Sequence, residues 1–196
     1  MIELTNRQEE IINAAINIIA ENSAHDLSMR GVAERVGISE PAIYRHFDNK
    51  ADLLLKLTHY IAQHQTAILQ RSDSPDVPAL IQLEDMLDGM IKNYANNRSL
   101  TTTLYATGMF YANQELVEGL SSIIENSLTS IKRLVEKGRG DGSLYEKINP
   151  DHISLVIFGA MRLLTERWIL SGHDFDLVPA WSVVWGELRR MLTVPE

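Results

Sequence analysis

The residues best suited to chemistry lie in one stretch of the chain, from Ser28 to Phe47, where polar, aromatic and basic side chains alternate with apolar ones. Arg45 carries a fork of donors that fits the edge of a guanine, or a phosphate if its helix rolls. Tyr44 and His46 can donate to phosphates, and Lys50 follows close behind them. Together these side chains indicate contact with a nucleic acid.

The smaller residues of the same stretch complete this chemistry. Pro41 and Ala42 suit apolar contact with a thymine methyl and let a helix approach closely. Ser28 and Ser39 stand where helices are expected to begin, and a helix N-terminus attracts anions. Glu40 disfavours a phosphate, but its carboxylate can accept a hydrogen bond from the amino group of cytosine. The stretch can therefore both hold a backbone and read bases.

Two short helices hinged at Gly37 are predicted to position these side chains. Their crossing needs a small inner residue, which is Ala33, and a glycine that permits an unusual backbone angle. A structural helical hairpin fits this bare spacing equally well, but more residues agree with the DNA-reading pair than the spacing requires. The expected core residues of the pair are Val32, Val36, Ile38, Ile43 and Phe47. A helix-turn-helix over about 28–47 is thus predicted, and such motifs place the second helix in the DNA major groove.

The rest of the chain shows apolar residues at helical spacing and no convincing strand alternation. Thr5 and Gln8 form a plausible capping box for a first helix that ends near Asn22. Further helices are expected from 48 or 49 to a break at 72–78, then over 79–94, 100–111, 113–138, 150–172, and from 176 or 178 onward. The predicted fold class is all-α, with about nine helices.

Composition excludes several classes of protein. With 196 residues, 45% of them hydrophobic, the chain can bury a real core. The absence of cysteine excludes disulfides, thiolate metal sites and a cysteine nucleophile. The six histidines lack metal-ligand spacing, and neither a phosphate loop nor a Gly-x-Ser-x-Gly motif occurs. We expect neither catalysis nor a metal or cofactor. Without a membrane-length apolar run or a signal-peptide pattern, a cytoplasmic protein is expected.

The net charge of −8 argues at first sight against a DNA-binding protein, because cations that neutralise phosphates supply much of the affinity. Within 27–56, however, basic residues slightly outnumber acidic ones, and the acidic excess lies elsewhere in the chain. A near-neutral reading head on an acidic body suggests few phosphate contacts and little indiscriminate binding.

The segment Val32-Ala-Glu-Arg-Val-Gly-Ile-Ser-Glu-Pro-Ala-Ile-Tyr-Arg-His-Phe-Asp-Asn-Lys-Ala-Asp-Leu-Leu54 resembles the DNA-binding domain of the TetR family of bacterial transcriptional regulators. The match spans roughly 5–57, and its Ile-Tyr-Arg-His-Phe-x-x-Lys portion is highly specific. The resemblance implies a three-helix DNA-binding head, here residues 1–50, followed by a larger helical domain over 51–196 that binds an effector and forms a homodimer. The implied DNA-contacting positions are Ser28, Arg30, Ser39, Glu40, Pro41, Ala42, Tyr44, His46 and Lys50. Some members carry arginine, lysine or glutamine where Glu40 stands, so base preference does not transfer.

The resemblance also guides expectations for the C-terminal part, where only the segment 158–172 is similar to the family's penultimate helix. Because that helix generally joins the dimer bundle, a seam on the last two helices is expected, with intramolecular core as the alternative. Its candidate residues are Ile157, Leu164, Trp168, Trp181, Trp185 and Leu188. An effector pocket is expected from the family more than from the pattern, because such residues are commonly plain core. Its candidates are Met86, Met90, Tyr94, Tyr105, Met109, Phe110 and Arg162.

These expectations combine into one functional hypothesis. The chain is predicted to be a homodimeric repressor that binds a palindromic operator in double-stranded DNA. A small apolar or amphipathic effector is predicted to release it, and no membrane partner is expected. The alternative is a ligand-independent DNA-bound scaffold that responds to a protein partner.

Overall fold

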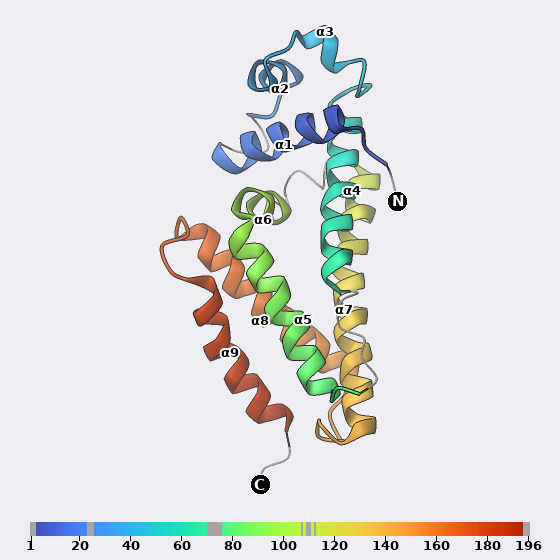
Figure 1. Cartoon of the computed structure of the whole chain (residues 1–196), viewed down its shortest axis with the longest axis vertical. Helices are drawn as coiled ribbons and strands as arrows, with labels where there is room; N and C mark the ends of the chain where they lie inside the picture. Colours follow the sequence, from blue (N-terminus) through green and yellow to red (C-terminus); the bar gives the residue numbers. More distant parts are fainter. Residues whose placement is uncertain are drawn as a thin grey trace. The chain divides into compact units, whose positions relative to one another are not determined.

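The computed structural model describes residues 3–22, 26–69, 76–106, 108, 111 and 113–193. Within these ranges all regular structure is helical (Figure 1). The helices are α1 (Asn6–Glu21), α2 (Met29–Val36), α3 (Glu40–Ile43), α4 (Lys50–Leu69), α5 (Ala79–Asn96), α6 (Arg98–Tyr105), α7 (Gln114–Asp141), α8 (Pro150–Leu170) and α9 (Leu177–Leu192). The predicted all-α class and the count of nine helices are confirmed for the described part of the chain.

The helices form two compact units. The first unit joins Met1–His64 with Asn97–Ile123, and the second joins Gln65–Asn96 with Ile124–Glu196. These units are divided differently from the domains expected at 1–50 and 51–196. The reason is that α6 packs against α1, which brings residues from 97 onward to the same unit as the head. Both α4 and α7 contribute residues to each unit.

Local sequence signals set the helix ends of the first unit. Thr5 caps α1, and its partner Gln8 completes the predicted capping box. The hydroxyl of Ser28 accepts a hydrogen bond from the backbone N–H of Gly31 and so caps α2. A buried hydrogen bond joins α6 to α1, from Thr103 Oγ1 to the carbonyl oxygen of Ile16 at 3.2 Å. Within the first unit, α1 is therefore fixed to α6 by a polar contact as well as by packing.

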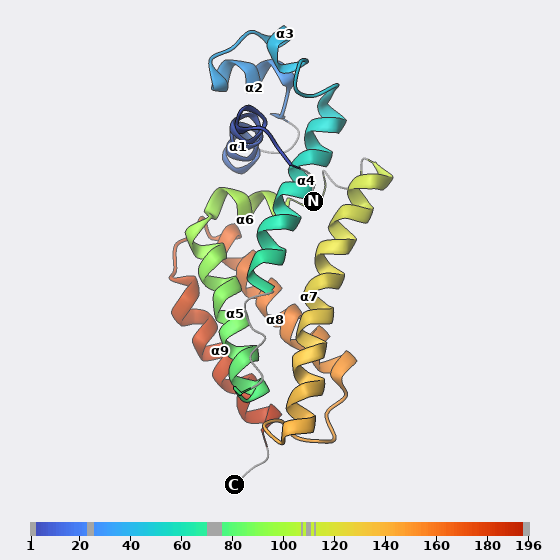
Figure 2. The ribbon, with the colours of Figure 1, turned by 45° about the vertical axis from the view of Figure 1, so that its right-hand side comes forward.

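In the second unit α9 packs against both α5 and α8, which Figures 1 and 2 show from two sides. An ion pair at 3.3 Å joins Arg189 of α9 to Glu84 of α5. The carboxylate of Asp141 accepts a hydrogen bond from the backbone N–H of Ala79, so the end of α7 caps the start of α5. The largest fully buried side chains of this unit include Trp168 and Trp181.

Some helix bounds differ from the sequence prediction. The expected stop at 138–142 is confirmed, but only its last glycine ends the helix: α7 continues through Gly138 to Asp141, and Gly142 follows with a φ of 77°. A Cβ on Gly138 would lie 2.7 Å from Cδ1 of Leu144. This glycine therefore permits a close approach of the following loop and does not end the helix. The helix expected over 100–111 begins two residues earlier, at Arg98.

Candidate nucleic-acid interface

The hinge between α2 and α3 has the geometry that the sequence predicts. Gly37 adopts the left-handed conformation with φ 75° and ψ 33°, which an L side chain adopts only with strain. Ala33 is buried beneath the crossing at 2% exposure, and the backbone N–H of Ile38 donates to its carbonyl oxygen at 3.0 Å. The small inner residue and the glycine turn thus meet as expected.

The second helix of the pair is shorter than the sequence predicts. Helix α3 spans only Glu40–Ile43, and turns follow it to His46. Ser39 occupies the cap position, but its side chain makes no capping hydrogen bond. The segment from Glu40 to Phe47, called the reading segment below, is held instead by Ile43 and Phe47. These two side chains are 0% and 1% exposed, and a 3.1 Å hydrogen bond joins their backbones. Two buried anchors four residues apart therefore keep the intervening side chains on the outside.

Every predicted contact residue of the head is at least partly exposed. Ser28, Arg30, Ser39, Pro41, Tyr44 and Arg45 are exposed, and Glu40, Ala42, His46 and Lys50 are partly buried. Tyr44 retains 48% of its surface although it is aromatic. A large aromatic side chain left in water directly after α3 is the group that a phosphate or base would cover.

Arg30 differs from the other predicted contacts because it already has an acidic partner. Its Nε donates to Oε1 of Glu34 at 2.8 Å, and both side chains are well exposed. The hydrogen bond that Arg30 donates to Glu34, followed by the charges of Glu34 and Glu40, raises the pKa of Arg30 above its usual value. Exposed pairs of this kind are weak, so a phosphate can replace Glu34 at little cost. Arg30 is thus available to DNA only by exchange of partners.

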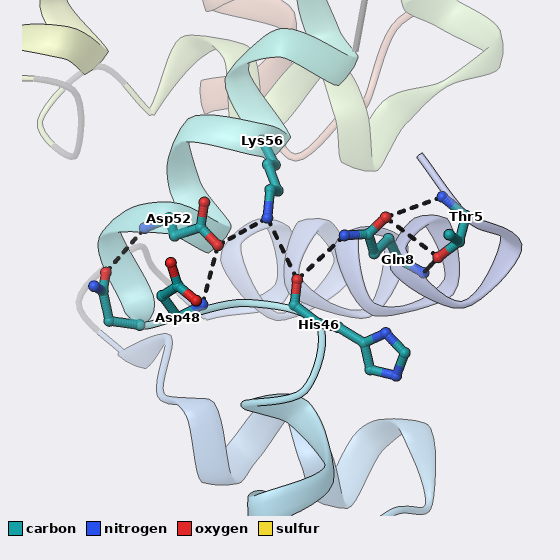
Figure 3. A network of polar contacts seen from close by, with 7 residues as sticks. Thr5, Gln8, His46, Asp48, Asp52 and Lys56 are labelled. Atoms are coloured by element: carbon teal, nitrogen blue, oxygen red, sulfur yellow. Dashed lines mark hydrogen bonds and ion pairs between the residues drawn. The ribbon is translucent and has the colours of Figure 1, made fainter. Parts of the chain in front are cut away.

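A polar network behind the reading segment was missed by the sequence analysis. The carbonyl oxygen of His46 accepts hydrogen bonds from Nε2 of Gln8 at 3.2 Å and from Nζ of Lys56 at 3.4 Å (Figure 3). Lys56 also pairs with Asp52 at 2.9 Å, and Asp52 accepts from the backbone N–H of Asp48. The end of the reading segment is therefore tied to α1 and to α4.

Two details of this network concern function. Nζ of Lys56 lies 5.0 Å from the centre of the Phe47 ring, so the same ammonium group also packs over a buried anchor. The imidazole of His46 points away from the network and is left for an outside partner (Figure 3). The i, i+4 spacing of Asp52 and Lys56 was the one available sequence signal for this arrangement.

The residues expected at a dimer seam lie in the interior of the second unit. Ile157, Trp168, Trp181 and Trp185 are each at most 3% exposed, Leu164 is 9% exposed, and Leu188 is partly buried. A side chain that its own chain covers has almost no surface left for a second chain. Five of these six side chains therefore face the chain's own core, and Leu188 keeps part of its surface exposed.

The expected pocket residues are divided between the two units. Met86, Met90 and Tyr94 follow one another along α5 and are buried within the second unit, where Arg162 of α8 is partly buried. Tyr105 ends α6 in the first unit. Met109 and Phe110 lie outside the described residues. The structure also contains a surface depression of about 540 Å³ lined by Arg167, Leu170, Ser171, Asp174 and Phe175, none of which was a candidate.

Across the described ranges, no helix has the length and apolarity required to cross a membrane. The same ranges contain no group of three or more side chains arranged to hold a metal ion.

Comparison with known proteins places the chain in a family. The model for bacterial regulatory proteins of the tetR family matches residues 11–57, and the model for the C-terminal region of YsiA-like proteins matches residues 55–188. The chain belongs to the TetR family of bacterial regulatory proteins. This membership confirms the resemblance that the residues of the hinge pair indicate, and it makes the head a DNA-binding helix-turn-helix.

Similar TetR-family proteins point in two functional directions. The fatty acid metabolism regulator protein of Bacillus subtilis is 24% identical over 176 residues, covering 86% of this chain and 87% of that protein. The nucleoid occlusion factor SlmA of Vibrio cholerae is 23% identical over 192 residues, covering 94% and 96%. The structure of FadR from B. subtilis in complex with stearoyl-CoA has a TM-score of 0.78 at 23% identity, covering 92% of this chain and 96% of that one.

Proposed function

We propose that this protein is a homodimeric repressor that binds a palindromic operator and is released by a small apolar or amphipathic effector. The observation that carries the DNA-binding part is the reading segment itself, in which Tyr44 and Arg45 are exposed while Ile43 and Phe47 anchor it from below. The proposal includes no catalytic step, and two of the similar proteins named above, the fatty acid metabolism regulator protein and FadR of B. subtilis, are named as regulators.

Within the segment we assign different tasks to neighbouring residues. Arg45 reads a base edge or grips a phosphate, and Tyr44, His46 and Lys50 hold the backbone. Pro41 and Ala42 permit close approach, and Glu40 sets a local preference by accepting from cytosine. The ion pair of Arg30 opens on binding. These tasks follow from side-chain chemistry and exposure.

The homodimer is supported by an apolar face that the second unit leaves uncovered. Leu155, Leu163 and Leu170 on α8 are 61%, 60% and 80% exposed, and Val183 and Met191 on α9 are 70% and 72% exposed. Their spacing of three to four residues, or multiples of it, puts them on one side of each helix, opposite the buried tryptophans. An apolar stripe of this kind on two adjacent helices fits a second copy, and a palindromic operator requires a two-fold protein.

The effector class is supported by the relatives. One of them is named a fatty acid metabolism regulator, and a structural neighbour holds stearoyl-CoA. An acyl thioester is amphipathic, which agrees with the class that the sequence suggests. We therefore propose long-chain acyl-CoA as the first effector to test.

The deciding experiment selects bound fragments from genomic DNA at near-physiological salt and footprints the protein on the most enriched fragment. A two-fold site is expected, with half-sites separated by whole helical turns. Arg45→Ala should lower affinity for this site by about 1–3 kcal/mol if Arg45 reads a base, and the salt dependence should stay unchanged. A phosphate contact would instead reduce the slope of log affinity against log salt by about 0.9. Lys92→Ala, which removes a charge from the second unit, is the matched control. Equal operator affinity in both variants would refute the assignment of a DNA contact to Arg45 of the reading segment.

Leu163→Asp tests the dimer. A carboxylate on an apolar seam would lose its hydration, so the variant should sediment as a monomer and bind the operator weakly. Ile81→Asp makes the same change at an exposed residue of α5 and should leave the dimer intact. A dimeric Leu163→Asp variant would contradict the assigned face.

A second candidate function is a DNA-bound scaffold that answers to a protein partner. The observation in its favour is that several similar proteins are named nucleoid occlusion factors. The two functions differ in their response to an effector. If the footprinted complex is released by stearoyl-CoA, the repressor is supported, and if it persists at saturating stearoyl-CoA, the scaffold takes its place.

A further inference from the structure

Two indole groups inside the second unit have no hydrogen-bond acceptor among the residues that the structure describes. Trp181 and Trp185 are 1% and 3% exposed, and Nε1 of each is buried without a partner among the described residues. They follow one another on α9, and their rings stack with centroids 6.2 Å apart and planes 20° apart. The two indoles are therefore neighbours in the interior, one helical turn apart on α9.

The third tryptophan shows how this protein satisfies an indole that serves only packing. Nε1 of Trp168 donates to the carbonyl oxygen of Phe175 at 2.9 Å. An indole N–H that is buried without an acceptor destabilises the folded protein, and phenylalanine would pack similarly without that cost. Two unsatisfied donors side by side are an exception to the rule that buried polar groups are hydrogen-bonded, and such exceptions are expected at binding sites.

The chemistry of the interior restricts what can pair with these donors. An indole N–H only donates, so its partner must be an acceptor. Among the described residues, the buried polar side chains are hydroxyls and amides, and none is charged. An ionised carboxylate in such surroundings would remain uncompensated at high cost, whereas a neutral carbonyl would not.

We infer that Trp181 and Trp185 donate hydrogen bonds to the neutral acyl carbonyl of an amphipathic ligand whose acyl chain is bound within the second unit. The inference deepens the proposed function and rests on its effector. It assigns the two tryptophans to ligand recognition, and it leaves the dimer to the opposite face of α9. One carbonyl oxygen has two lone pairs and can accept from both indoles.

The test uses the full-length protein labelled with ¹⁵N at its three tryptophan indoles. Phenylalanine variants at each position assign the three signals. The probes are stearoyl-CoA and its thioether analogue S-octadecyl-CoA, which lacks only the carbonyl oxygen. Stearoyl-CoA should move the indole protons of Trp181 and Trp185 downfield, whereas the thioether should not. The signal of Trp168 should stay in place with both probes.

Affinities separate the hydrogen bond from packing. Trp181→Phe and Trp185→Phe should each weaken the binding of stearoyl-CoA about two- to tenfold, the effect of one neutral hydrogen bond, and should leave thioether binding unchanged. A loss of packing would weaken both probes equally and would overturn the inference. Trp168→Phe is the matched control, with no selective effect on the thioester.

Failure of the inference and failure of the proposed function give different results. If the unliganded protein binds its operator but does not bind stearoyl-CoA, or binds both probes equally, the acyl-carbonyl inference is overturned and DNA binding stands. If the two indole shifts occur but no operator is found, the proposed repressor fails and the ligand site stands.

Discussion

The same substitution, glycine to alanine, is predicted to have opposite effects at two positions of this chain. Gly37 has φ 75°, and a Cβ there would meet no atom within 4 Å. Any cost of Gly37→Ala therefore comes from the backbone angle and not from a clash. The left-handed conformation costs an L-residue about 1–2 kcal/mol, and the stiffer unfolded chain returns about 0.4–1 kcal/mol. The first unit should lose about 1 kcal/mol of unfolding free energy.

Native-state hydrogen exchange of the backbone amides in α1 measures this loss directly. Tryptophan fluorescence would not report it, because the three tryptophans all lie in the second unit. A loss of about 1 kcal/mol corresponds to roughly fivefold faster exchange through global opening of the unit. Gly140→Ala is the matched control, since Gly140 is an exposed residue within α7 and also has open space around its Cβ position. There alanine should stabilise by up to about 1 kcal/mol, which tryptophan fluorescence should report as a higher urea midpoint.

A second substitution, Gly37→Asn, tests whether the backbone angle causes the loss of stability. Because asparagine tolerates the left-handed region better than alanine does, Gly37→Asn should recover part of the loss. If Gly37→Ala leaves exchange in α1 unchanged, or if Gly37→Asn is the more damaging of the two, the backbone-angle argument is refuted.

Two further predictions concern polar contacts. Lys56→Met keeps an apolar stem near Phe47 but removes the charge-assisted hydrogen bonds to His46 and Asp52. The affinity for the operator, measured by gel shift, should fall by about 1–2 kcal/mol, while sedimentation should still show a dimer. Unchanged affinity would mean that the network does not hold the reading segment. Asp141→Ala removes the cap of α5 and should lower the urea midpoint of the second unit by an amount equal to about 0.5–2 kcal/mol. Burial raises the pKa of Asp141, but hydrogen bonds from Ser143 and Ala79 outweigh it and lower the pKa below its usual 3.8. The stabilisation is therefore present above about pH 4 and is lost as pH falls below that value, and a wild-type midpoint that falls no faster than that of the variant in this range would contradict the linkage.

The helix-turn-helix could be predicted from the sequence because its signals are local. The capping box at Thr5, the serine cap of α2 and the glycine of the turn each act within a few residues. Ile43 and Phe47 were placed inside by their spacing alone, and they are buried. The network around His46 could not be found in this way, because Gln8 and Lys56 reach one carbonyl oxygen from two different helices.

The sequence by itself determined that the chain is helical, where most helices begin, and which stretch presents its polar side chains outward. The tertiary structure decided which face of each apolar helix is covered. Helix α8 carries apolar residues around most of its circumference, so its periodicity identifies no single buried side. Packing against other helices, α9 among them, decides which side is buried. Packing put Ile157 and Trp168 of α8 inward and left Leu155, Leu163 and Leu170 in water. It also enclosed two indole donors that have no acceptor within the described part of the chain. Whether a buried donor finds an acceptor depends on its neighbours in three dimensions, and residue spacing along one helix does not predict it.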